Sequence, residues 1–237
     1  VLSYVGFGRA HAAVTGNVDF RRALTLALVR SGLAGTGIGE RLVPAASPIA
    51  ADLGGAAMTA AAAAGDADGA RAALTKAAAK VADLGADRRG QLGLKILVET
   101  SRFDDRELAE RVARALDKLG VGATIDAVSP GTLRSKIASG ACDLYIGQLA
   151  PPGTVAAAWL LAFEAGGNTW ARDRLARGTF DGRAAEAEFA ASVPIVPIVH
   201  RAIRYQLRTD VRGAGVDASA RLVWAELFFY GRPRQAS

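Results

Sequence analysis

The alternation of apolar and polar positions divides the first part of the chain into short, separate elements. Residues 2–8 are mostly apolar and predict a short strand. A helix is expected from Asn17, a favourable N-cap, to about Arg30, because apolar residues follow at helical spacing. The segment 31–55 is rich in glycine and proline and lacks periodicity, so it is interpreted as a loop. A second helix is predicted to begin at Asp66 or Asp68.

The middle of the chain alternates between strand and helix patterns. In order, the predicted elements are strand 92–98, a helix from Asp104 or Asp105 to about 119, strand 121–128, helix 130–139 and strand 142–149. Ser129-Pro130 supplies an N-cap followed by a proline at the first helical position. This β-α-β-α-β order predicts a sheet with at least one right-handed parallel crossover and helices over its faces.

The last third of the chain predicts two helices and several extended segments. Thr154 caps a helix to about Phe163, and a helix 181–191 follows. The run 193–200 is extended and apolar, and its two prolines predict that its first part is an edge or terminal strand. Residues 203–207 are also extended. The tail 222–237 is too apolar in its first half to be free in solution, so it is expected to dock onto another surface.

Composition narrows the class of protein. Of 237 residues, 51% are hydrophobic, many of them alanine, and 6% are aromatic, which favours a helix-rich protein. The net charge of +6 comes from basic residues scattered among acidic ones, whereas nucleic-acid binders gather them on one face, so no nucleic-acid partner is expected. The sequence lacks a run of about 18 strongly apolar residues, so no membrane-spanning segment is expected. The start at Val1, without an initiator methionine or a signal peptide, indicates a processed or excised piece.

Residues with reactive side chains do not form a known catalytic motif. His11 and His200 are far apart and have no partner at zinc-ligand spacing. The lone Cys142 excludes an internal disulfide, and its neighbours predict a buried thiol. The adjacent carboxylates Asp104 and Asp105 are explained by capping and by the helix dipole. We therefore expect no catalytic residue, no metal and no cofactor.

The glycine-rich segments do not match a nucleotide-binding motif either. The cluster Gly35–Gly39 follows a helix and leads into a proline-containing loop, whereas a dinucleotide fingerprint follows a strand and opens a helix. Gly6-Phe-Gly-Arg follows a strand but lacks the third glycine and the later acidic residue.

Several segments, in the right order, resemble the second half of the family 5 extracellular solute-binding proteins, the oligopeptide, dipeptide and nickel receptors of ABC importers. The helix 19–30 is similar to the family's v-R-x-A-l-x-x-A-i-d-R helix. The other matching segments are Tyr4–Phe7, Gly65–Leu74, Leu92–Val128 with the turn Lys118–Val121, Ile137–Gly147, Glu186–Ile198 and Val211–Gly213.

The resemblance implies a fold and a function. The expected fold is an α/β, periplasmic-binding-protein-like (type II) lobe, in which residues 1–237 form a single C-terminal lobe with a mixed sheet and helices on both faces. The expected function is non-catalytic binding of a small molecule or peptide for import, in the periplasm or cell envelope. Its partners are an ABC permease and the N-terminal lobe of the same parent protein, onto which 222–237 is expected to dock.

The sequence departs from the family at its peptide anchor. Peptide receptors of the family follow the third strand with W-x-x-D-Y, whose aspartate pairs with the peptide amino terminus. Here Gln148 replaces the tryptophan and Pro151 replaces the aspartate, and proline offers neither a charge nor an N–H group. This loss motivates an alternative, a degenerate lobe used as an interaction or sensor module of an envelope protein; an enzyme is a third hypothesis.

Four residues are candidates for ligand contacts. Gln148 is the first, because open α/β sheets bind ligands at the carboxyl ends of their strands; it is otherwise an ordinary polar residue at a strand end. Trp170 offers a stacking face or packs on its own lobe, and Asn168 is a contact or a turn residue. Arg9 faces an anionic ligand or solvent. Arg30 is expected to pair on the surface of its helix.

Overall fold

A computed structural model describes residues 1–33, 42–51, 54–150, 154–201, 210–213, 223 and 227–229. Its strands are β1 (Leu2–Phe7), β2 (Leu42–Pro44), β3 (Gly93–Glu99), β4 (Gly122–Val128), β5 (Leu144–Leu149), β6 (Val196–Arg201), β7 (Val211–Arg212) and β8 (Phe228–Phe229). Its helices are α1 (Ala12–Thr15), α2 (Val18–Ala27), α3 (Ala60–Ala64), α4 (Ala67–Ala78), α5 (Phe103–Lys118), α6 (Pro130–Ser139), α7 (Val155–Ala165), α8 (Trp170–Ala176) and α9 (Gly182–Ser192), with short 3-10 turns at Ala82–Leu84 and Arg89–Gln91.

The first six strands form one mixed sheet in the order β2-β6-β1-β5-β3-β4. β3 pairs in parallel with both β4 and β5, so the predicted β-α-β-α-β unit contributes a parallel half-sheet. β1 runs antiparallel to β5 and β6, its neighbours on either side. β3, β5 and β6 therefore end at the same edge of the sheet, where β1 begins.

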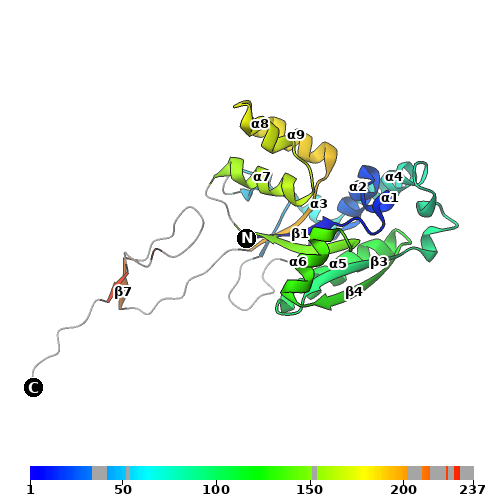
Figure 1. Ribbon diagram of the computed structural model, residues 1–237, viewed down its shortest axis with the longest axis horizontal. Coiled ribbons are helices and arrows are strands. Elements are labelled where there is room, and N and C mark those ends of the chain that lie inside the picture. The colour runs from blue at the N-terminus through cyan, green and yellow to red at the C-terminus, as the bar shows by residue number, and fades with distance from the viewer. Residues whose placement is uncertain are drawn as a thin grey trace, which may run out of the picture.

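The sheet separates two apolar cores, as the alternation of side chains along its strands requires. One core joins α2, α4 and α5 to one face of the sheet, through residues such as Val5, Ile96 and Ile146. The other joins α6, α7 and α9 to the opposite face, through Tyr4, Leu97, Tyr145 and the α7–α9 aromatics, with the buried Cys142. The mixed sheet with helices on both faces agrees with the expected fold class, and Figure 1 shows α7, α8 and α9 grouped away from α2, α4 and α5.

The predicted caps begin their helices. The side chains of Asn17, Asp66, Ser129, Thr154 and Asp181 each accept a hydrogen bond from the backbone of the first turn that follows. These bonds satisfy N–H groups that the helix itself leaves free, which is why the starts were readable from local sequence.

Other boundaries differ from the prediction. α5 begins at Phe103, ahead of Asp104, and Arg102 at its N-cap makes no side-chain capping bond. α2 ends at Ala27 rather than near Arg30. The short elements β2, α3 and α8 were not predicted, because three to seven residues carry too little periodicity to recognise.

The first part of the run 193–200 was predicted to be an edge or terminal strand, and among the described residues β6 has a partner strand on only one side there, whereas its second half is paired on both sides. β6 lies between β1 and β2, and its one proline, Pro197, is accommodated locally. The register with β1 shifts between Ser3 and Tyr4, next to the pairing of Tyr4 with Pro197. On the other side, β2 pairs only with the residues from Val199 to Arg201, beyond the prolines.

Arg30 was expected on a helix surface, and this prediction was wrong. Its side chain is 2% exposed and lies beyond the end of α2. Its guanidinium donates to the carbonyl oxygens of Thr25, Leu28 and Pro197 at 3.1, 3.3 and 2.9 Å. It thereby caps the C-terminus of α2 and ties it to β6.

Some predictions concern residues outside the described ranges. These are the glycine cluster 35–39, Pro151, the extended run 203–207 and most of the tail 222–237. Phe228 is exposed, and β8 pairs with β7. Within the described residues, no helix combines the length and apolarity that crossing a membrane requires.

Candidate functional site

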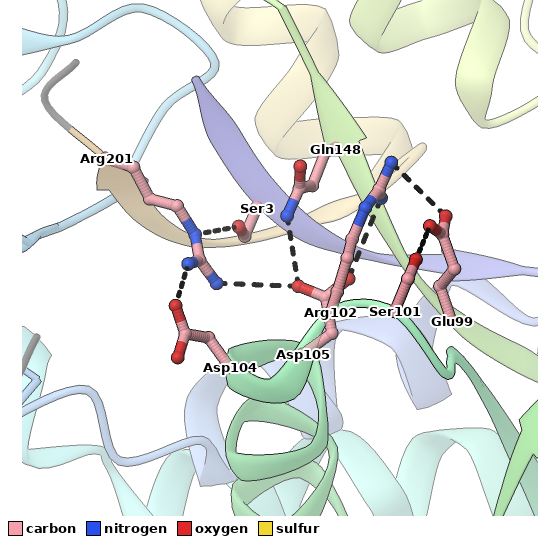
Figure 2. Close-up of polar contacts among 8 residues, drawn as sticks. All are labelled: Ser3, Glu99, Ser101, Arg102, Asp104, Asp105, Gln148 and Arg201. Carbon is pink, nitrogen blue, oxygen red and sulfur yellow. Dashed lines mark hydrogen bonds and ion pairs between the residues drawn. The ribbon is translucent and has the colours of Figure 1, made fainter.

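A group of polar side chains gathers where β3, β5 and β6 end and β1 begins. Leu2 pairs with both Leu149 and His200, which brings the end of β5 and the end of β6 beside the start of β1. In an open α/β sheet this edge is where ligands bind. We call its polar residues the edge cluster: Ser3, Glu99, Ser101, Arg102, Asp104, Asp105, Gln148 and Arg201 (Figure 2).

Asp105 lies at the centre of the edge cluster, in the first turn of α5. It is fully buried, and its Oδ1 accepts a hydrogen bond from Gln148 Nε2 at 3.1 Å and lies 3.4 Å from Arg201 Nη2. Gln148 reaches it because residues 144, 146 and 148 of β5 alternate toward the face that α5 covers. The other oxygen, Oδ2, is buried and has no hydrogen-bond partner among the described residues.

The two arginines of the edge cluster are held differently. Arg201 has a side chain 10% exposed, donates to Ser3 Oγ at 2.9 Å and to Asp104 Oδ2 at 2.7 Å, and exchanges backbone hydrogen bonds with Val1. Arg102 has a side chain 38% exposed and makes ion pairs with Glu99 Oε2 at 3.3 Å and with Asp105 Oδ2 at 3.7 Å. The second distance is too long for a hydrogen bond. Arg201 is thus a fixed part of the edge, whereas Arg102 is loosely attached.

The electrostatics of the edge cluster centre on Asp105. Burial raises the pKa of this carboxyl group above its ordinary value, against the opposing effects of the Gln148 amide and of the guanidiniums of Arg201 and Arg102. Glu99 adds to the rise by repulsion. The cluster holds three carboxylates and two guanidiniums, so its formal charge is negative when all are ionised.

Of the four predicted contacts, only Gln148 belongs to the edge cluster. Arg9 follows the other end of β1, is exposed, and lies against the turn before β5, where its Nη2 is 3.4 Å from the carbonyl oxygen of Ser139. The length of β1, about 20 Å at strand rise, separates it from Gln148. The structure therefore does not bring these two residues together.

Asn168 and Trp170 lie in the α7–α8 connection. The Asn168 side chain accepts a hydrogen bond from the backbone N–H of Trp170 at 2.8 Å, as a turn residue does. The Trp170 ring packs against Phe163 at 5.4 Å and Phe180 at 6.4 Å. The end of α7 lies over Tyr145, whose hydroxyl donates to Ala165, so this connection is on the side of the sheet opposite to α5.

Sequence reasoning missed most of the edge cluster, although one signal was available. The strand-end rule that selected Gln148 applies equally to Glu99 and to the α5 start with Asp104 and Asp105, because parallel strands end together. For Arg201 no local signal existed, since the position of β6 beside β1 depends on long-range pairing. No group of three or more His, Cys, Asp or Glu side chains within the described ranges could hold a metal ion.

The chain matches a protein-family model. The family model described as "Bacterial extracellular solute-binding proteins, family 5 Middle" matches residues 2–170. No curated protein matches the sequence.

Several solved structures share this fold. Pheromone receptor PrgZ, described with its mode of peptide binding, has a TM-score of 0.70 at 14% identity, over 96% of this chain and 48% of that one. NikA from Staphylococcus aureus, in complex with Ni(L-His)2, has a TM-score of 0.68 at 15% identity, over 96% and 51%. HbpA2 from Haemophilus parasuis has a TM-score of 0.67 at 16% identity, over 96% and 48%. The chain thus spans about half the length of these proteins.

Proposed function

The chain belongs to the bacterial extracellular solute-binding proteins of family 5, and we propose from this membership that it is one lobe of a solute receptor serving an ABC-type importer. The receptor captures a small molecule or a peptide and presents it to a membrane permease, with no catalytic step. It works in the periplasm or at the cell envelope.

The observation that carries this proposal is the edge cluster. A polar group collects at the carboxyl ends of β3, β5 and β6, the edge at which open α/β sheets bind ligands. Gln148 is the proposed solute contact there. Its amide N–H faces Asp105, and its side-chain carbonyl oxygen points away from Asp105 (Figure 2), without a hydrogen-bond partner in the described part of the chain.

The second lobe of the receptor is proposed to come from the same parent protein. The structural match covers 96% of this chain but only 48% of PrgZ and of HbpA2. About half of each of those proteins therefore has no counterpart in this chain. Binding is then a shift between open and closed arrangements, driven by solute contacts with both lobes. Arg9, Asn168 and Trp170 take no part in the proposed contact, because they lie away from the edge cluster.

A specific observation favours a second candidate, a degenerate lobe that serves as an interaction or sensor module. Most polar groups of the edge cluster already pair with one another, as Arg201 does with Ser3 and Asp104. A site whose polar groups already pair with one another gains less favourable free energy from binding a ligand.

Thermal unfolding of the full-length protein that carries this chain tests the two candidates. A panel of di- and tripeptides, Ni(II)–histidine and small sugars is added at millimolar concentration. A receptor is stabilised by its solute in proportion to the logarithm of concentration over Kd, so at least one class should raise Tm by several degrees. Gln148→Ala should reduce that rise, whereas the exposed control Gln91→Ala should not. Silence across every class would overturn the receptor proposal and favour the degenerate lobe.

A further inference from the structure

Asp105 presents a buried carboxylate oxygen whose hydrogen-bonding capacity is unused. The residue is fully buried, and Oδ2 lacks a hydrogen-bond partner among the residues that the structure describes. Leaving such an acceptor unsatisfied costs about 1–3 kcal/mol, and more for a charged group. Gln148 Nε2 and Arg201 Nη2 already lie against Oδ1, at 3.1 and 3.4 Å, so a further donor can be accepted only at Oδ2.

The group facing Oδ2 is a cation of the protein itself. Arg102 Nη1 lies 3.7 Å from Oδ2, close enough for attraction but beyond hydrogen-bond length. Its other terminal nitrogen lies 3.3 Å from Glu99 Oε2, and its side chain is 38% exposed. Arg102 can therefore leave Oδ2 and keep Glu99 as a partner.

The side chain of Arg102 is held in place less firmly than that of Arg201. It stands at the N-cap of α5 but makes no side-chain capping hydrogen bond. Arg201 differs, because its hydrogen bonds to Ser3 and Asp104 hold it at 10% exposure. Of the two guanidiniums beside Asp105, Arg102 is the one that a ligand can displace.

We propose that the edge cluster binds a cationic group of the solute, an ammonium or a guanidinium, which takes the place of Arg102 against Asp105 Oδ2. The inference rests on the proposed function and narrows it to solutes that carry such a group. The Gln148 side-chain carbonyl adds a second acceptor at the same edge. An anionic group is disfavoured, since the three carboxylates of the cluster outnumber its two guanidiniums.

The test measures binding to the full-length protein by isothermal titration calorimetry with matched probes. Tri-alanine carries a terminal ammonium, N-acetyl-tri-alanine is the same peptide without that charge, and agmatine carries its cations without a peptide. We expect tri-alanine or agmatine to bind. If tri-alanine binds, its affinity should exceed that of its acetylated form by about tenfold or more. Binding of tri-alanine identifies a peptide amino terminus as the source of the cation, and binding of agmatine alone identifies a non-peptide cation.

Variants of the edge cluster separate displacement from a structural role. Arg102→Gln removes the internal competitor and should tighten binding of the cationic probe by about tenfold, with no change for the acetylated peptide. Asp105→Asn should weaken the binding of the cationic probe by at least about tenfold. The matched control is Arg106→Gln on the same helix, which removes an exposed arginine paired with Glu110 and should change nothing.

Failure of the inference and failure of the receptor proposal give different results. Equal affinity for tri-alanine and its acetylated form, or binding of neither cationic probe, overturns the inference. If another solute still stabilises the protein, the receptor proposal survives that result; if none does, both fall. Should Asp105→Asn fail to fold, Arg102→Gln decides, because unchanged or weaker cation binding in that variant contradicts displacement.

Discussion

The side-chain amide of Gln148 donates a hydrogen bond to Oδ1 of Asp105 across 3.1 Å, joining the end of β5 to the first turn of α5. An ionised carboxylate only accepts hydrogen bonds, so the amide must turn its N–H group toward Asp105 and its carbonyl oxygen away. The contact both connects two elements and presents an acceptor at the edge where a solute is proposed to bind.

Replacing Gln148 tests the connecting role. Gln148→Ala leaves the buried Oδ1 of Asp105 without its hydrogen-bond donor, so the free energy of unfolding should fall by about 1–3 kcal/mol in urea titrations. Gln148→Glu sets a second carboxylate against Asp105, and its larger loss at neutral pH should diminish as acid protonates the pair. Gln91→Ala is the exposed control. Unchanged stability in Gln148→Ala would show that the bond is not formed in solution.

Gly147 is expected to be intolerant of a side chain. It pairs with Tyr4 across β1 and β5, and an added Cβ would lie 2.3 Å from Cζ of the Tyr4 ring. That ring packs edge-on against Tyr145 at 6.0 Å and has little room to move. Gly147→Ala should therefore lower the free energy of unfolding by about 1–3 kcal/mol. The control Gly131→Ala adds a methyl group where nothing lies within 4 Å, and it should cost far less.

Arg30 is expected to contribute through its buried hydrogen bonds. Burial lowers the pKa of its guanidinium to about 10, but three backbone carbonyls accept its N–H groups. Arg30→Met keeps the length of the stem and removes all three donors, so we expect a loss of about 2–4 kcal/mol in denaturant unfolding. Arg30→Lys should recover only part of this, since an ammonium lacks the planar fork. Full recovery by lysine would contradict the geometry.

The Asp19–Lys80 pair should make stability depend on pH. Lys80 Nζ lies 2.6 Å from Asp19 Oδ2, and this hydrogen bond, the largest cause, lowers the pKa of the carboxyl group below its ordinary 3.8. The folded state thus prefers the ionised form. Its stabilisation is fully present above pH 3.8 and is lost as the pH falls through the lower folded pKa.

Asp19→Asn measures that dependence. Because Lys80 is largely exposed, we expect a difference from wild type of about 1 kcal/mol at pH 6. The difference should shrink toward zero as urea titrations are repeated below pH 3.8. The exposed Asp83→Asn serves as the control. A difference that is constant with pH would mean that the ion pair does not stabilise the fold.

The predictable features depended on neighbouring residues. The helix starts at Asn17, Ser129 and Thr154 could be predicted, because an N-cap side chain accepts a hydrogen bond from the backbone two or three residues ahead. The strands β3, β4 and β5 were visible as apolar runs bounded by turns. The prolines of 193–200 indicated an edge position for the first part of this run, whereas the pairing of its second part with β2 depends on a partner strand far away in the sequence.

Local sequence was sufficient for the order of the longer strands and helices, the starts of most of these helices and the position of Gln148 at a strand end, because each depends on spacing within a few residues. The tertiary structure alone decided that Arg201, Ser3 and Asp105 meet Gln148 at one edge of the sheet. It also separated Arg9 from that edge and buried Arg30 among carbonyl oxygens. The physical reason is that pairing β1 with β5 and β6 brings together residues nearly two hundred positions apart, and no local pattern encodes such pairing.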